Sequence, residues 1–172
     1  MHTTVHFSNI KSEIIGNLKK ATREIKVAIA WLTEEDNNRT LTQKAESGLN
    51  VQIVMSESKE NYRNTSKFKD FLRFGGKLHI AAPKFLHNKF CIIDGNTIIN
   101  GSYNWTYFAQ GNDENILIIT LDSNVQEDNK LLTAFDAKHK FFCEKASMHV
   151  TDISELNRFR EQGKVAAVIL AQ

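Results

Sequence analysis

Proline is scarce in this chain of 172 residues, which holds one proline and eight glycines. Disordered linkers and low-complexity segments are rich in these residues, and the sequence shows no repeat or biased tract. With 41% apolar and 24% charged residues, the composition is that of an ordinary globular protein. We therefore expect one ordered domain with a hydrophobic core.

Cysteine is scarce too, and the two cysteines, Cys91 and Cys143, do not have the spacing of a zinc site. Cys91 lies in an apolar run, where a cysteine serves as a small hydrophobic residue. No apolar run approaches the length of a membrane span, and residues 1–6 lack the basic start and apolar core of a signal peptide. These features predict a soluble protein of the reducing cytoplasm, without stable membrane association.

A large excess of either charge is also missing, because the chain has 22 Lys and Arg and 20 Asp and Glu, which gives a net charge of +2. This balance is too mild to establish a nucleic-acid partner, although it is compatible with a local basic patch. The polar segment 56–67 carries Lys59, Arg63 and Lys67 around Tyr62. It is either a solvated loop or a basic lip whose aromatic ring stacks on nucleic acid.

What the chain does contain is an alternation of helical and strand patterns, which predicts an α/β fold. Apolar residues recur at helical spacing from residue 10 to about 23, and nearly continuous apolar runs at 25–31 and 51–55 predict buried strands. A helix between these strands is expected to begin after Thr33 and to end before Gly48, which makes a βαβ unit with parallel strands. Further strands are predicted at 5–7, 77–82, 85–93, 97–99 and 116–119, and further helices at 68–74 and 125–145. Leu131, Leu132, Phe135, Phe141 and Phe142 would be the buried contacts of the last of these helices.

Polar residues gather around the predicted hairpin of strands 85–93 and 97–99. Because side chains alternate along a strand, His87 and Lys89 should share one face, while Asp94 should lie on the other. Asp94 precedes Gly95 and Asn96, a sequence typical of a tight turn. After the returning strand, Gly101 and Ser102 are small enough to let the backbone approach a ligand. Asn104 would lie at the same edge of the sheet.

These residue types are suited to a phosphodiester. A neutral imidazole can attack phosphorus and form a covalent intermediate. A lysine ammonium and neutral serine and asparagine donors can stabilise the charge that develops on the nonbridging oxygens. The scheme requires neither a metal nor a cofactor.

The pattern His-x-Lys-x4-Asp-x6-Gly-Ser-x-Asn resembles the HKD signature of the phospholipase D superfamily. The chain has all of its positions: His87, Lys89, Asp94, Gly101, Ser102 and Asn104. Trp105 and the acidic segment 112–115 before an apolar strand are also similar to the family. The weaker alternative is a core histidine and a surface lysine that happen to flank a hairpin. The resemblance implies a layered α/β fold, with a mixed central sheet flanked by helices.

The resemblance also implies roles for individual residues. His87, Lys89, Asn104 and Glu114 would be catalytic, and Lys89, Ser102 and Asn104 would bind the phosphate. In the family an acid at the place of Glu114 holds the second ring nitrogen of the nucleophilic histidine, although Asp113 is an alternative one residue away. Asp94 and Gly101 are interpreted as structural members of the motif, and His79, which alternates with apolar residues, as a structural histidine.

The signature occurs once, whereas two HKD motifs face each other in one site of the family. A single copy resembles the small bacterial endonucleases that complete the site by dimerising, so we expect a homodimer that cleaves DNA, or RNA, through a phosphohistidine. A phospholipid phosphodiesterase of the cardiolipin type is the alternative. It would require an apolar surface near the site, for which 105–108 and the terminal run 165–170 are candidates. A nucleic-acid-binding module without turnover is the third hypothesis.

We expect residues 1–145 to form the catalytic domain and residues 146–172 to form a C-terminal extension. The extension has a helix start at 151–155. It would dock on the domain, contact another subunit or join a larger protein. Of the four aromatic residues at 103, 105, 107 and 108, two or three should fill the core.

Overall fold

A mixed sheet forms the centre of the computed structural model, which describes residues 1–145 and 147–169, without the side chains of residues 162–169. Within these residues, eight strands are arranged in the order β1-β7-β6-β5-β2-β3-β4-β8. They are β1 (His2–His6), β2 (Glu24–Ile29), β3 (Asn50–Ser56), β4 (Lys77–Ala81), β5 (Lys89–Ile93), β6 (Thr97–Gly101), β7 (Ile116–Thr120) and β8 (Ser147–Val150). The helices are α1 (Ile10–Lys20), α2 (Glu35–Glu46), α3 (Lys59–Tyr62), α4 (Lys69–Arg73), α5 (Gln126–Lys145) and α6 (Ile153–Ile169), with short 3-10 turns η1 (Thr65–Phe68) and η2 (Phe108–Gly111).

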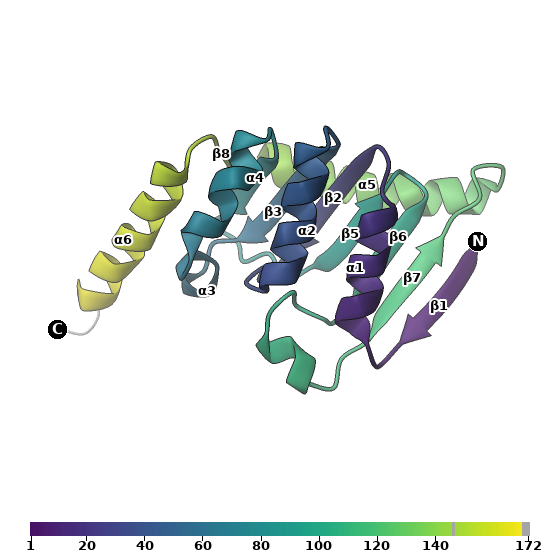
Figure 1. Ribbon diagram of the computed structural model, residues 1–172, viewed down its shortest axis with the longest axis horizontal. Helices are drawn as coiled ribbons and strands as arrows, with labels where there is room; N and C mark the ends of the chain where they lie inside the picture. The colour runs from purple at the N-terminus through teal and green to yellow at the C-terminus, as the bar shows by residue number, and fades with distance from the viewer. Residues whose placement is uncertain (146, 170–172) are drawn as a thin grey trace.

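Helices cover both faces of the sheet, with α1, α2 and α4 on one face and α5 on the other (Figure 1). On the first face Ile14, Leu41 and Phe71 pack against the sheet, and on the second Phe142 contacts the cluster that contains Phe90. The predicted layered α/β fold is therefore confirmed. Phe141 is an exception to the predicted core, because it is 47% exposed and lies under the ammonium of Lys138.

The βαβ unit β2–α2–β3 has the predicted parallel strands, and β4 continues the parallel part of the sheet. Its helix begins one residue later than expected. The cap of α2 is Glu34, whose carboxylate accepts a hydrogen bond from the backbone N–H of Asn37 at 2.9 Å. Just before the helix, the backbone N–H groups of Thr33 and Glu34 both donate to the carbonyl of Trp105.

The β5–β6 hairpin has the predicted turn, in which Asp94 and Gly95 have φ values of 52° and 69°. Positive φ at both central residues is typical of a type I′ turn. The predicted start of the first hairpin strand, at residue 85, was too early. β5 begins at Lys89, which pairs with Ile29, the last residue of β2, so residues 85–88 have no ladder to join.

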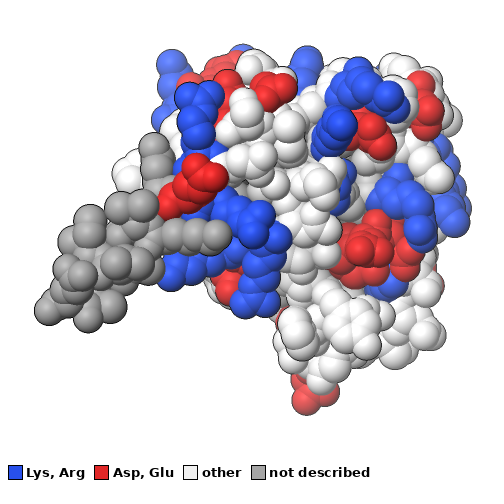
Figure 2. All heavy atoms as spheres, turned by 60° about the vertical axis from the view of Figure 1, so that its left-hand side comes forward, with Lys and Arg blue, Asp and Glu red and all other residues white. Residues whose placement is uncertain are grey.

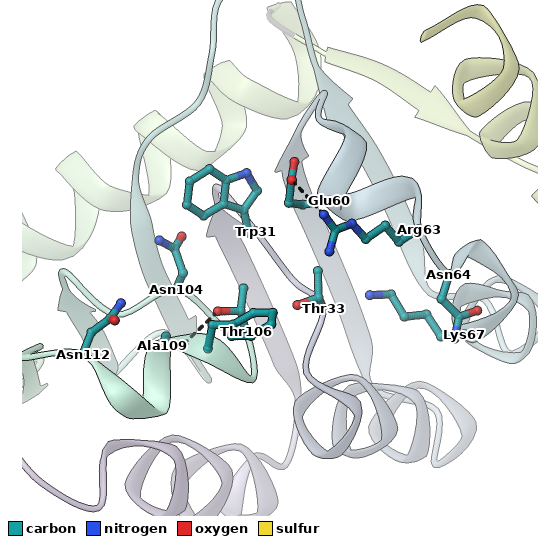
Figure 3. Close-up of a pocket in the computed structure, with 11 residues that line it drawn as sticks. Trp31, Thr33, Glu60, Arg63, Asn64, Lys67, Asn104, Thr106, Ala109 and Asn112 are labelled. Carbon is teal, nitrogen blue, oxygen red and sulfur yellow. Dashed lines mark hydrogen bonds and ion pairs between the residues drawn. The ribbon is translucent and has the colours of Figure 1, made fainter. Parts of the chain in front are cut away.

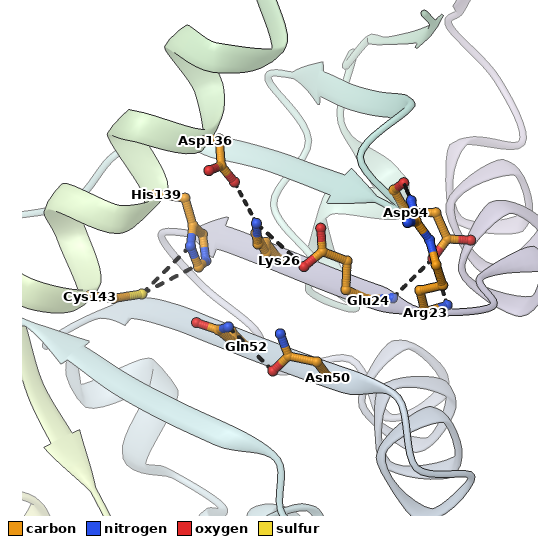
Figure 4. A network of polar contacts seen from close by, with 9 residues as sticks. All are labelled: Arg23, Glu24, Lys26, Asn50, Gln52, Asp94, Asp136, His139 and Cys143. Atoms are coloured by element: carbon orange, nitrogen blue, oxygen red, sulfur yellow. Dashed lines mark hydrogen bonds and ion pairs between the residues drawn. The ribbon is translucent and has the colours of Figure 1, made fainter. Parts of the chain in front are cut away.

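Asp94 lies at the opposite end of β5 from His87, where its carboxylate joins the hairpin to the start of β2 (Figure 4). It accepts hydrogen bonds from the backbone N–H groups of Thr22 and Arg23 at 2.8 Å and of Glu24 at 3.0 Å. Burial by itself raises the pKa of this carboxyl, but the donated hydrogen bonds outweigh it and lower the pKa to about 2.

The C-terminal segment adds to the body of the molecule. β8 pairs antiparallel with β4, Leu156 of α6 is fully buried, and the ring of Phe159 stacks on Tyr62 with centroids 6.2 Å apart. Tyr62 is thus a core residue, 5% exposed, and the proposal of a stacking aromatic at this position was wrong. The apolar run at 165–170 lies outside the residues whose side chains are described.

We predict that Asp94→Asn lowers the free energy of unfolding by about 1–2 kcal/mol at neutral pH, because the amide cannot accept all the backbone donors. Since the folded pKa, about 2, lies below the ordinary value of 3.8, the carboxylate stabilises the fold above pH 4 and this contribution is lost as the pH falls toward 2. Urea unfolding at several pH values checks the prediction. Asp70→Asn on α4 is the matched control, and an equal loss in both variants would contradict it.

Candidate active site

The ends of four strands meet at one edge of the sheet and bring the motif together. β5 starts opposite the end of β2, β6 ends opposite the start of β5, and Gly101 at the end of β6 pairs with Ile116 at the start of β7. His87 therefore precedes β5, Ser102 and Asn104 follow β6, and Glu114 precedes β7 at the same edge. Of the predicted site residues, the structure places only Asp94 at the other edge.

The imidazole of His87 is exposed and rests against two aromatic rings. Its centroid lies 6.5 Å from that of Trp31, in an edge-on arrangement at 75°, and 5.7 Å from that of Phe85. Within the described part of the chain, its ring nitrogens make no hydrogen bond. The nitrogens are therefore open to an incoming group while the ring is held by packing. Sequence reasoning missed Trp31 and Phe85 as neighbours of His87.

Lys89 is 9% exposed and its Nζ donates a hydrogen bond to the carbonyl oxygen of His87 at 2.8 Å. Burial lowers the pKa of this ammonium below its ordinary value, while attraction by the Glu114 carboxylate acts in the opposite direction. Lys89 thus places a positive charge close to His87, with a negative partner nearby on the other side of the hairpin.

Glu114 is tied to the motif through Ser102. The Ser102 hydroxyl donates to the Glu114 carboxylate and accepts from the backbone N–H of Asn115 at 3.1 Å. Asn112 donates a second hydrogen bond to Glu114 at 3.3 Å, whereas the side chain of Asp113 is exposed. No hydrogen bond joins Glu114 to His87 in the described chain, so the orienting role of Glu114 stays a prediction.

Gly101 lets β6 and β7 approach each other at this edge. A Cβ atom at this position would lie 2.8 Å from the Cα of Ile116 and still closer to the carbonyl oxygen of Asn115. Backbone atoms cannot move aside as the tip of a side chain can. The motif glycine is therefore required by the close approach that sets the position of Ser102 and Glu114.

Asn104 belongs to a loop that is joined to the end of β2. The next residue, Trp105, is 3% exposed, and its backbone N–H donates to the carbonyl of Trp31 at 3.1 Å. The backbone N–H groups of Thr33 and Glu34 donate to the carbonyl of Trp105 at 2.9 and 3.0 Å. Asn104 itself is 9% exposed, and its Oδ1 has no partner among the described residues. The Asn104 amide oxygen can therefore accept a further hydrogen bond.

Asn104 and Trp31 line a pocket of about 340 Å³ beside the motif (Figure 3). Arg63 and Lys67 form the opposite side, so part of the predicted basic lip does reach the site. The complete lining is Trp31, Thr33, Glu60, Arg63, Asn64, Lys67, Asn104, Thr106, Phe108, Ala109 and Asn112. Burial lowers the pKa of Lys67 to about 8, and its Nζ donates to the carbonyl of Leu32.

Two of the four clustered aromatic residues are core, as expected: Tyr103 is 2% and Trp105 3% exposed. Tyr107 and Phe108 are 73% and 77% exposed, respectively, and Phe108 lines the pocket. His79 is buried in a different cavity, under α5, where its ring lies 4.8 Å from that of His149. Among the described residues, no group of three or more His, Cys, Asp or Glu is arranged to hold a metal ion.

A family model described as the phospholipase D-like domain of cardiolipin synthase matches residues 14–136, which include every position of the motif. The chain belongs to the phospholipase D superfamily. This membership confirms the family predicted from the signature. No helix among the described residues of this phospholipase D-like chain is both long and apolar enough to span a membrane.

Curated relatives of the superfamily match parts of the chain. A mitochondrial cardiolipin hydrolase of Chlamydomonas reinhardtii is 28% identical over 134 residues, which cover 76% of this chain and 56% of that protein. The human mitochondrial cardiolipin hydrolase is 39% identical over 75 residues, which cover 40% of this chain and 30% of the relative. The chain thus spans between 30% and 56% of the length of these two relatives.

Among solved structures, Nuc from Salmonella typhimurium, a phospholipase D family member, superposes with a TM-score of 0.74 at 20% identity. The match covers 87% of this chain and 97% of Nuc. NucT from Helicobacter pylori has a TM-score of 0.68 at 20% identity, with 85% of this chain and 98% of NucT covered. These similarities show that the fold is that of small phospholipase D-like proteins.

We predict that Gly101→Ala lowers the free energy of unfolding by about 1–3 kcal/mol, because the added methyl group pushes β7 away from β6. Thermal unfolding measures the loss. Gly111→Ala is the control, since a Cβ atom at Gly111 meets nothing within 4 Å. The interpretation would be wrong if Gly101→Ala were as stable as the control.

Proposed function

We propose that this protein is a metal-independent phosphodiesterase, an endonuclease that cleaves DNA, with RNA as a further substrate, through a phosphohistidine intermediate in a site shared by a homodimer. The observation that carries the proposal is that an open imidazole, His87, and the buried Lys89, whose ammonium donates to the backbone carbonyl of His87, lie at one sheet edge. Membership of the phospholipase D superfamily supports phosphodiester chemistry.

In the first step, a ring nitrogen of His87 attacks phosphorus and forms an N–P bond while the P–O bond to the leaving group breaks. His87 of the partner subunit gives a proton to the leaving oxygen. In the second step, that residue removes a proton from water, and the water oxygen displaces His87 from phosphorus. Lys89 and Asn104, with Ser102, would stabilise the charge on the phosphate oxygens, and Glu114 would orient the imidazole.

We place the second histidine of the reaction on a second subunit because the motif itself holds one histidine, His87. His79 and His139 are 8% and 2% exposed and line the cavity under α5, on the far side of the sheet from α1 and α2. Burial lowers the pKa of both to about 4, with further contributions from their neighbours. Neither is placed to protonate a leaving group at His87, so we assign the general acid to a second copy of the chain.

Nucleic acid is the favoured substrate because positive side chains border the pocket beside the motif. Arg63 and Lys67 point into this pocket (Figure 3), and Figure 2 shows basic side chains gathered on this face of the molecule beside an uncharged strip. Nuc and NucT, which this chain covers almost completely, share its size and fold. The two free cysteines suit a reducing compartment, and we propose that the protein acts in the cytoplasm.

A phospholipid phosphodiesterase is the second candidate. It is favoured by the curated relatives, which are mitochondrial cardiolipin hydrolases, and by the exposed rings of Tyr107 and Phe108 near the motif. Such rings suit a membrane interface. A nucleic-acid-binding module is the third candidate, and it would show salt-sensitive binding without turnover.

We predict that the pure protein cleaves single- or double-stranded DNA in EDTA and that His87→Ala lowers the rate about 10³-fold or more, because the nucleophile is lost. Gel assays measure the cleavage of DNA and RNA, and lipid analysis measures the hydrolysis of cardiolipin vesicles. His149→Ala, which removes a histidine from the other cavity, is the control. Cleavage of cardiolipin alone, or loss of activity in EDTA, would contradict the proposal of a metal-independent nuclease.

A site shared by two subunits predicts how activity responds to mixing. When wild-type protein exchanges subunits with an excess of His87→Ala, activity should fall with the square of the wild-type fraction, because only dimers with two intact histidines turn over. A linear fall would show that each chain works alone. Light scattering establishes the dimer, and a phosphoprotein that is lost on treatment with hydroxylamine and is missing from His87→Ala supports the intermediate.

A further inference from the structure

The pocket beside the motif has two unlike walls. One wall comes from the segment that holds α3 and η1 and presents Arg63 and Lys67. The other comes from the segment after the motif and presents Asn104 and the ring of Phe108. Trp31, whose ring also packs on His87, lies between them (Figure 3). A ligand in this pocket would therefore touch a residue that contacts His87.

The cations of this pocket are available to an anionic ligand. Arg63 is 71% exposed, and its one ion pair among the described residues is with Glu60, three residues away, at 3.5 Å. Exposed pairs at this spacing contribute little, so a phosphate can displace the carboxylate. The Lys67 ammonium donates one hydrogen bond to the carbonyl of Leu32 and has further N–H donors for a ligand. Glu60 is the carboxylate that lines the pocket beside these two cations.

The aromatic wall is unusually exposed. Phe108 is 77% and Tyr107 73% exposed, and their rings meet edge-on with centroids 5.9 Å apart. Phe108 can accept a flat ring from the side of the pocket, and nucleic-acid bases stack on such rings without regard to sequence. At about 340 Å³ the pocket is at the small end of ligand sites, and a single base fits within it.

We propose that this pocket is a subsite for one unpaired nucleotide next to the scissile phosphate, with the base on Phe108 and a neighbouring phosphate on Arg63 and Lys67. The inference rests on the proposed nuclease function and specifies its substrate as single-stranded nucleic acid. In duplex DNA each base is already stacked and paired, so filling the subsite would require the base to be extruded first.

The test compares an unstructured single-stranded DNA, the same strand in a duplex, and bis(p-nitrophenyl) phosphate, a small diester without a neighbouring nucleotide. We expect wild-type protein to cleave the single strand about tenfold faster than the duplex, and Phe108→Ala and Arg63→Gln each to lower the ratio of DNA to small-diester turnover about tenfold. One abasic residue beside a cleaved diester should slow cleavage there in the wild type and should have no effect in Phe108→Ala.

Two matched controls separate the pocket from general effects. Arg73→Gln removes an arginine that is also exposed and paired three residues away, with Asp70, but lies outside the pocket. Phe7→Ala removes another ring that is 75% exposed. Both should keep the wild-type ratio. Equal cleavage of single strand and duplex, or an abasic effect that persists in Phe108→Ala, would overturn the subsite.

Failure of the proposed function gives a different result. Wild-type protein would then leave both DNA and the small diester intact, as His87→Ala does. If Phe108→Ala and Arg63→Gln lowered the hydrolysis of cardiolipin vesicles but not of DNA, the pocket would bind a lipid. That result would contradict the nucleotide subsite.

Discussion

Backbone hydrogen bonds at Trp105 join the motif loop to the end of β2, and the site depends on this join. The Trp105 carbonyl accepts from Thr33 and Glu34, and its N–H donates to Trp31. Asn104 is thereby held against Trp31, and Trp31 against His87. Because the Trp105 side chain is buried, water does not compete for these bonds. The join also includes Glu34, the cap of α2, so the start of this helix is connected to the motif loop.

Two anchors at opposite ends of β5 keep the hairpin in register. At the far end, Asp94 accepts three backbone N–H groups from the start of β2, and at the site end Gly101 lets β7 pass close to β6. The signature therefore contains residues for two different purposes. Asp94 and Gly101 hold the strands, while His87, Lys89 and Asn104 lie at the end of the sheet where we propose that a substrate binds. The six positions of the signature therefore do not all lie at one site.

Sequence reasoning reached the fold because local patterns and the fold agree. Apolar runs of strand length at 25–31 and 51–55, with a helix between them, predict a βαβ unit with parallel strands, which the structure has. The hairpin followed from Asp94 and Gly95, which tolerate positive φ. The start of β5 was missed because a strand ends where its neighbours end, and the length of β2 cannot be read from residues 85–88. Tyr62 was misplaced for a similar reason, since its burial depends on α6, nearly a hundred positions later.

By itself the sequence determined the family of this protein, through a histidine, a lysine and an asparagine at fixed spacing and the turn and glycine between them. Such a pattern is local, so the types and order of its residues carry it. Only the tertiary structure decided what lines the pocket beside the motif, because Trp31, Arg63 and Phe108 come from three separate segments. They meet where the sheet order brings the end of β2 beside the start of β5, and long-range strand order is not written in any single stretch of residues.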